Sequence, residues 1–152
     1  MRLSFRKNLL ALLACLVLTT LATDGASTAS PAPPNPVLVF MGQEFYEANG
    51  KQWTRYKYSV FNLAEYPNEL FAPAPELPPC GTNTKASRTW VDIYDERGKR
   101  LYGFCALGNR DNLGKLWFAL ETDVIPPSWI YIEMNDRKTN TKYKSNMAET
   151  TL

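Results

Sequence analysis

Apolar and polar residues alternate along several short segments of the chain, which is the pattern of half-buried β-strands. The clearest case is the segment 53–62. Tyr56, Tyr58 and Val60 share one face of it, and the residues between them are charged or polar. We therefore expect a strand with one face in a core and the other in water.

The same criterion predicts six further strands, and no segment after residue 36 shows helical periodicity. Asn49-Gly50 is a strong hairpin signal between the first two strands. The predicted strands cover residues 37–46, 53–62, 88–94, 100–107, 115–120, 128–135 and 141–145. Seven short strands predict the all-β class, as a single antiparallel β-sandwich over residues 37–146.

Prolines interrupt this pattern twice. The segment 30–36 reads as a linker, because proline lacks an N–H donor and restricts the residue before it. The segment 64–85 carries five prolines and is expected to be a long loop that contributes to a contact surface. Residues 147–152 have no pattern and are expected to form a flexible tail.

The amino terminus has the organisation of a signal peptide over residues 1–29. Arg2, Arg6 and Lys7 precede an apolar run at 9–21 and a small, polar stretch. The run is shorter than the roughly twenty residues that span a bilayer. Cleavage after either Ala22 or Ala29 fits, and both predict a periplasmic or extracellular protein with no remaining transmembrane segment.

The segment around Cys15 offers an alternative, because Leu12-Leu13-Ala14-Cys15 resembles a bacterial lipobox. Lipidation of Cys15 would give a membrane-tethered lipoprotein. Apolar residues follow Cys15, where lipoproteins usually turn polar, so the cleaved signal is preferred. The mature chain then keeps two cysteines, Cys80 and Cys105, and an exported protein with two cysteines is expected to form a disulfide.

Two resemblances support this outline. The run 126–132, Pro-Pro-Ser-Trp-Ile-Tyr-Ile, with the hairpin after it resembles an immunoglobulin-like or fibronectin type III-like β-sandwich. Cys80 departs from that arrangement, since it lies in the Pro-rich loop. The segments 71–75, 78–83, 87–94 and 102–107 resemble a group of exported bacterial proteins of no assigned activity, which implies compartment and module size but carries no catalytic residue.

Composition narrows the function classes. The chain of 152 residues has 45% hydrophobic and 12% aromatic residues, enough for a folded core. It has no histidine, which excludes Ser-His-Asp and Cys-His sites and most zinc sites. Cleavage after Ala22 leaves 14 basic against 15 acidic residues, so nucleic-acid binding is not expected.

Outward aromatic residues form the first candidate site. If the alternate residues of 88–94 and 128–135 are core, then Trp90, Tyr94, Trp129 and Tyr131 face solvent. Such residues suit stacking on sugar rings or anchoring a protein interface. The alternative is that they pack beneath a neighbouring loop or serve a structural role.

A calcium site is the second candidate, because Asp92, Asp95 and Asp111 lie near predicted interstrand loops. An ordinary polar hairpin loop over residues 95–99 is the preferred explanation, and otherwise no cofactor is expected. The sequence thus predicts a non-catalytic envelope module that binds a protein partner. A carbohydrate-binding module and a small envelope hydrolase are the alternatives.

Overall fold

The computed structural model describes residues 32–79, 87–105 and 108–151. These belong to one compact unit that begins at Ala32. The predicted signal peptide, including Cys15, lies outside the described residues. Among the described residues, no helical segment is long and apolar enough to cross a membrane.

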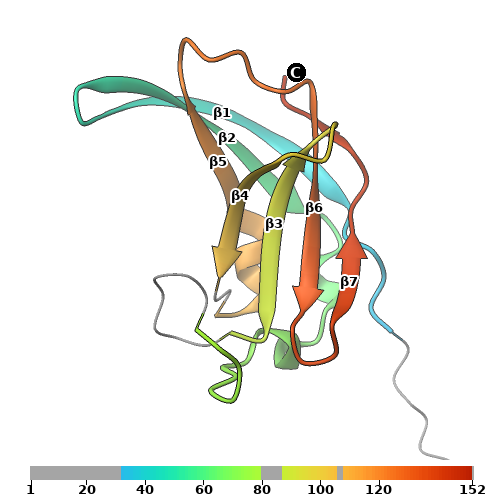
Figure 1. Cartoon of the computed structure of the whole chain (residues 1–152). Coiled ribbons are helices and arrows are strands. Elements are labelled where there is room, and N and C mark those ends of the chain that lie inside the picture. Colours follow the sequence, from blue (N-terminus) through green and yellow to red (C-terminus); the bar gives the residue numbers. More distant parts are fainter. Residues whose placement is uncertain (1–31, 80–86, 106–107, 152) are drawn as a thin grey trace, which may run out of the picture. The chain divides into compact units, whose positions relative to one another are not determined.

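The fold is all-β and consists of two antiparallel sheets (Figure 1). One sheet has the order β1-β2-β5. The other has the order β4-β3-β6-β7, with β8 pairing β6 beside β7. The strands are β1 (Leu38–Ala48), β2 (Lys51–Val60), β3 (Thr89–Asp95), β4 (Arg100–Cys105), β5 (Leu116–Glu121), β6 (Trp129–Asp136), β7 (Thr141–Lys144) and β8 (Ala148–Glu149).

The seven predicted strands are confirmed as β1 to β7. Asn49 and Gly50 form the predicted turn, with φ of 52° and 70°, a conformation that Asn and Gly tolerate best. In β2, the predicted core face is buried and the alternate residues are partly exposed. Alternation therefore identified both the strands and their faces.

Facing side chains from both sheets and from the segment after β2 fill the core. Val91, Ile93, Ile130, Ile132 and Met134 are fully buried on the second sheet. The first sheet contributes a ring cluster, in which Phe118 stacks on both Tyr56 and Tyr58. Two antiparallel sheets with one buried face each make a sandwich-like arrangement.

The prediction of a flexible tail is wrong for the residues that form β8. Ala148 and Glu149 pair with Ile130 and Trp129 of β6, and Ala148 is buried. Thr150 is also buried, and its backbone N–H donates to the carbonyl of Ser128. Two residues are too few for a periodic pattern, so this edge pairing left no signal in the sequence.

The Pro-rich segment is a loop as predicted, and part of it packs into the core. It contains two short 3-10 helices, η1 (Leu63–Glu65) and η2 (Asn68–Phe71), and a third, η3 (Arg110–Lys115), precedes β5. The side chains of Tyr66, Leu70 and Phe71 are buried in the core. Residues 64–79 therefore contribute to the core through these side chains, while most of the other residues in this range are exposed. Residues 80–85 lie outside the described residues.

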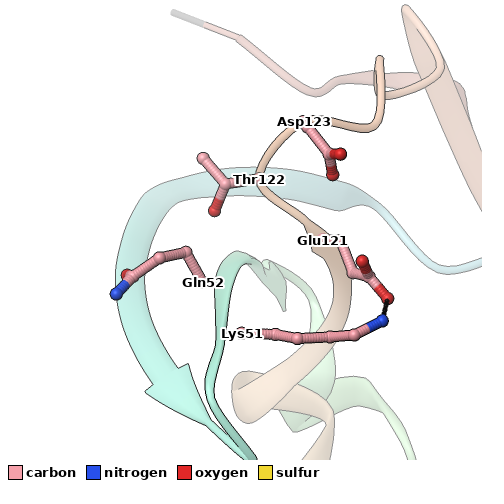
Figure 2. A pocket seen from close by; sticks show the side chains of 5 residues that line it. All are labelled: Lys51, Gln52, Glu121, Thr122 and Asp123. Carbon is pink, nitrogen blue, oxygen red and sulfur yellow. Dashed lines mark hydrogen bonds and ion pairs between the residues drawn. The ribbon is translucent and has the colours of Figure 1, made fainter.

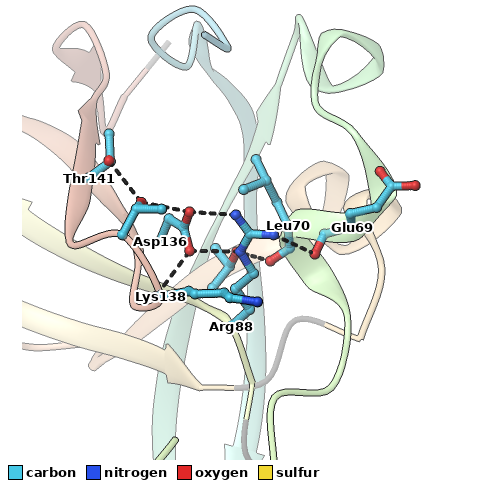
Figure 3. Close-up of polar contacts among 8 residues, drawn as sticks. Glu69, Leu70, Arg88, Asp136, Lys138 and Thr141 are labelled. Carbon is cyan, nitrogen blue, oxygen red and sulfur yellow. Dashed lines mark hydrogen bonds and ion pairs between the residues drawn. The ribbon is translucent and has the colours of Figure 1, made fainter. Parts of the chain in front are cut away.

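A buried ion pair fastens this segment to the second sheet (Figure 3). Arg88 donates to both carboxylate oxygens of Asp136, at 2.8 and 2.7 Å, and also to the carbonyl of Glu69. Asp136 is 3% exposed and accepts further bonds from Lys138 and Thr139. Bidentate geometry with every oxygen satisfied is the condition under which a buried pair is tolerated.

The segment predicted as a linker is tied to the domain at its end. The hydroxyl of fully buried Tyr66 donates to the carbonyl of Pro34 at 2.6 Å. The backbone N–H of Val37 donates to the side chain of Asn62 at 2.9 Å. Burial raises the pKa of Tyr66 well above its ordinary value, so this hydroxyl remains a donor at physiological pH. The chain thus enters β1 from a fixed point.

Candidate functional site

The first candidate site is the outer edge of β1, the first strand of its sheet. One side of β1 pairs along its length with β2. On the other side, Leu38 exchanges two hydrogen bonds with the side chain of Asn146, at 2.8 and 3.0 Å. Over the described residues, no strand pairs with this side from Val39 to Ala48. Unpaired backbone groups on an edge strand are a template for another strand.

A β-bulge divides this edge into two parts. The register with β2 shifts by one residue between Phe40 and Gly42. Gly42 has a φ of +109°, a conformation that residues other than glycine rarely adopt. From Gly42 to Ala48 the register is regular, one residue against one. The edge therefore offers seven consecutive residues in regular strand geometry, bounded by the bulge and the turn.

Large apolar side chains lie exposed along β1. Phe45 is 65% exposed and Met41 is 59% exposed. Phe45 lies opposite Thr54 of β2, on the face that is core elsewhere in the sheet. In Figure 1 the β1–β2 hairpin extends beyond the strands of the second sheet. Phe45 is exposed on this face, although Thr54 opposite it is only 4% exposed. We call Gly42–Ala48, with these exposed groups, the β1 edge.

The opposite face of the hairpin is held by a network of charges and rings. Glu44 pairs with Arg55 at 2.5 Å and with Lys57 at 3.1 Å. These cations, Lys57 first, hold the pKa of Glu44 below its ordinary value. The Arg55 guanidinium lies 4.7 Å from the ring centres of both Tyr46 and Trp117. This network links the two strands of the hairpin to each other and to Trp117 of β5.

Trp117 continues this network onto the second sheet and was not identified from the sequence. Its ring stacks on Tyr102 of β4 at 5.7 Å and meets Phe104 edge-on at 6.3 Å. Tyr102 is 41% exposed. The alternation of 115–120 could have placed Trp117 on the non-core face, but nothing in the sequence pairs β5 with the edge of β4.

The predicted aromatic residues share the outer face of the second sheet, but their rings are already engaged. Tyr94 and Tyr131 are register partners and stack at 5.2 Å. Lys144 covers the Tyr131 ring at 4.0 Å. Trp129, 41% exposed, lies at one end of the face, and Trp90 lies at the other, opposite Asn135. The four residues therefore do not form one platform.

Trp90 belongs to a compact polar cluster. Its indole N–H donates to Asp92 Oδ1 at 2.7 Å, and Arg100 Nε donates to the same oxygen at 2.6 Å. The guanidinium lies 5.6 Å from the Trp90 ring centre. Gly103 makes this possible, because a Cβ there would overlap the guanidinium and lie 2.5 Å from Asp92 Oδ1. The hydrogen-bonding groups of Trp90, Asp92 and Arg100 therefore pair with one another, without a ligand.

Two carboxylates meet on this face, Asp92 and its register partner Glu133. Each is tied to a cation, Asp92 to Arg100 and Glu133 to Lys142 at 2.7 Å. A typical glycoside hydrolase needs two carboxylates across a substrate cleft. This pair lies on a sheet face, and the pocket described below is elsewhere.

The three predicted metal ligands are not brought together. Asp92 accepts hydrogen bonds from Trp90 and Arg100. Asp95 accepts the backbone N–H groups of Arg97 and Lys99, at 3.0 and 2.8 Å, and so shapes the β3–β4 turn. Asp111 lies in η3. Among the described residues, no three acidic, cysteine or histidine side chains lie close enough to hold a metal ion.

The predicted disulfide stays a prediction, since Cys80 lies outside the described residues. Cys105 is the last residue of β4, and its backbone is the register partner of Trp90.

A shallow pocket lies where β5 leaves the first sheet, at the base of the hairpin turn (Figure 2). Its lining is polar, and a 2.5 Å ion pair between Lys51 and Glu121 crosses it. Gln52, Thr122 and Asp123 complete it. Two of its charged groups, Lys51 and Glu121, are already paired with each other.

Comparison with known proteins identifies no relative. No protein-family model, no curated protein and no solved structure matches the chain.

Proposed function

We propose that the chain is an exported, non-catalytic binding module of the cell envelope, and that it holds a protein partner at the β1 edge. One observation carries the proposal. The seven regular residues of this edge pair on one side only and carry the exposed Phe45 at their centre.

The chemistry of the edge selects an extended polypeptide as the occupant. A strand edge presents N–H donors and C=O acceptors in a fixed order at the spacing of a β-strand. Another extended backbone matches this order, and side-chain contacts then add specificity. An apolar side chain on that strand would cover Phe45.

Export from the cytoplasm and a Cys80–Cys105 disulfide are parts of the same proposal. Export is supported by the basic residues and apolar run at the amino terminus, and the Cys80–Cys105 disulfide by the two cysteines left after signal cleavage. The immunoglobulin-like relationship is supported by the residue pattern at 126–132 and by two antiparallel sheets.

Carbohydrate binding on the second sheet has weaker support. Trp129 is exposed there, but Tyr94, Tyr131 and Trp90 already contact rings or charged groups of the same chain. If glycan binding is found and is lost on Trp90→Ala and Trp129→Ala, this alternative replaces the β1 edge.

Site-specific photo-crosslinking in the native host tests the proposal. A benzophenone amino acid replaces Phe45 in one variant and Phe61 in a control. Phe61 is 80% exposed and lies just after β2, at the far end from the hairpin turn. We expect a discrete cross-linked polypeptide from position 45 alone, joined through one sequenced segment. No product at position 45, or equal yield at position 61, would overturn the proposal.

A further inference from the structure

We propose that the strand at the β1 edge is β1 of a second copy of this chain, paired antiparallel about a two-fold axis. The inference rests on the proposed function, because it names the partner of the same edge. The sheet of one copy, β5-β2-β1, would then continue through the contact into a six-stranded sheet.

The position of Phe45 within the edge is the first argument. The regular stretch runs from Gly42 to Ala48, and its central residue is Phe45. A two-fold axis through this position pairs all seven residues and stops short of both the bulge and the turn. Closed two-fold contacts of this kind are the commonest form of self-association.

The side-chain pairs of this register are complementary. Phe45 faces its own copy, which forms an aromatic pair across the axis. Gln43 lies opposite Glu47 of the second copy, so an amide meets a carboxylate. Glu44 lies opposite Tyr46 of the second copy, so a carboxylate meets a phenol. Like charges are nowhere directly opposite each other.

The charges of the isolated chain agree with this register. Glu44 already has Arg55 and Lys57 as ion-pair partners. Glu47 accepts from Gln52 at 3.2 Å and has no ion-pair partner among the described residues, so it can accept from the incoming Gln43. The Tyr46 ring lies next to the Arg55 guanidinium, which also pairs with Glu44 of the same chain. Tyr46 and Glu44 therefore lie on the same face of β1.

Neighbouring two-fold registers are less favourable. An axis through Glu44 places two carboxylates opposite each other and brings the bulge at Met41 against Glu47. An axis through Tyr46 leaves five regular pairs and places Phe45 opposite Glu47. The register centred on Phe45 is therefore the one that the sequence of the edge fits.

Disulfide trapping in the purified mature chain tests both the contact and its register. Directly opposed residues of antiparallel strands have Cα atoms about 4.5–5.5 Å apart, within the range that a disulfide spans. We expect Phe45→Cys to form a covalent dimer under mild oxidation. Gln43→Cys and Glu47→Cys are expected to cross-link when mixed but not alone. The unsubstituted chain and Phe61→Cys give the background from the native cysteines.

Sedimentation measures the same contact without cross-linking. Seven paired residues make a small interface, so the self-association is expected to be weak. Phe45→Lys places two cations on the axis and is expected to raise the dissociation constant at least about tenfold. Phe61→Lys is the matched control and is expected to leave it unchanged.

The outcomes separate the two proposals. If Phe45→Cys cross-links no more than Phe61→Cys, the second copy is not the partner. Photo-crosslinking of a different polypeptide at position 45 would then retain the β1 edge as the binding site. If position 45 links to nothing, both proposals are wrong.

Discussion

The outer face of the second sheet and the β1 edge both expose aromatic residues, but they differ in what those residues contact. On the second sheet, Trp90 is bonded to Asp92, and Tyr94 stacks on Tyr131. On the β1 edge, Phe45 is 65% exposed and lies beside unpaired backbone. Exposure alone does not identify a binding site. A group that the fold leaves without a partner is the better indicator.

This difference gives a rule for substitutions. Changes within the network of the second sheet should lower the free energy of unfolding and leave binding intact. Changes on the β1 edge should weaken binding and leave the free energy of unfolding nearly unchanged.

Asp136→Ala removes one partner of the buried ion pair and leaves the Arg88 guanidinium without it. We expect a loss of about 3 kcal/mol in unfolding free energy, measured by chemical denaturation. Asp111→Ala, at an exposed acid in η3, is the control and should change it by less than about 0.5 kcal/mol. A small effect of Asp136→Ala would mean that the Pro-rich segment is held by packing alone.

The same pair predicts a pH dependence. Hydrogen bonds from Arg88, and then from Thr139 and the Lys138 backbone, lower the pKa of Asp136 below its ordinary value. Its stabilising effect is therefore complete above the unfolded-state pKa of about 4 and is lost as pH falls through the lower folded-state pKa. The stability difference between the natural chain and Asp136→Ala should narrow on acidification. A constant difference would contradict this assignment.

Tyr66→Phe removes the buried hydroxyl that binds the Pro34 carbonyl at 2.6 Å. We expect a loss of about 1–2 kcal/mol, since the carbonyl loses its partner while the ring remains. Tyr102→Phe is the control, because Tyr102 is 41% exposed. Faster amide exchange at Val37 in Tyr66→Phe would show that the entry to β1 has loosened, and unchanged exchange would show that Asn62 suffices.

Gly103→Ala should displace Arg100 from Asp92, at a cost of about 0.5–1 kcal/mol because Arg100 is half exposed. The direct readout is the NMR signal of the Trp90 indole N–H, which shares the same carboxylate oxygen. Gly108→Ala is the control, since its added Cβ meets no atom within 4 Å. An unmoved indole signal would show that the cluster does not depend on Gly103.

Phe45→Lys should have the smallest effect on stability, within about 0.5 kcal/mol, because the side chain is mostly in solvent. It should nevertheless strongly reduce disulfide cross-linking between Gln43→Cys and Glu47→Cys chains that also carry Phe45→Lys. A large loss of stability would show that Phe45 packs within its own chain, and the contrast between the two regions would fail.

Strand positions and faces were predictable because alternation is a local property. Tyr58 and Ile93 were assigned to the core from their neighbours alone, and both are at most 1% exposed. Gly42, within an otherwise regular strand, was a visible signal for the bulge.

The rest depended on contacts between distant segments. The Pro-rich segment, with Tyr66 and Phe71 buried, is linked to the second sheet through Arg88 and Asp136, which lie 48 positions apart. The engagement of the outward aromatic residues depends on Arg100 and Lys144, whose positions follow from strand order. The free edge of β1 likewise depends on which strand comes last in its sheet.

The anchoring of Pro34 by Tyr66 has a mechanical consequence. A pull on the chain ahead of Ala32 would reach the domain at Pro34 and at the bond between Val37 and Asn62, before it reached β1. Resistance to such a pull is set by the rate of unfolding rather than by equilibrium stability. The load would have to break this anchor before it could peel β1 from β2, so a tether to a surface could be strained without disturbing the β1 edge.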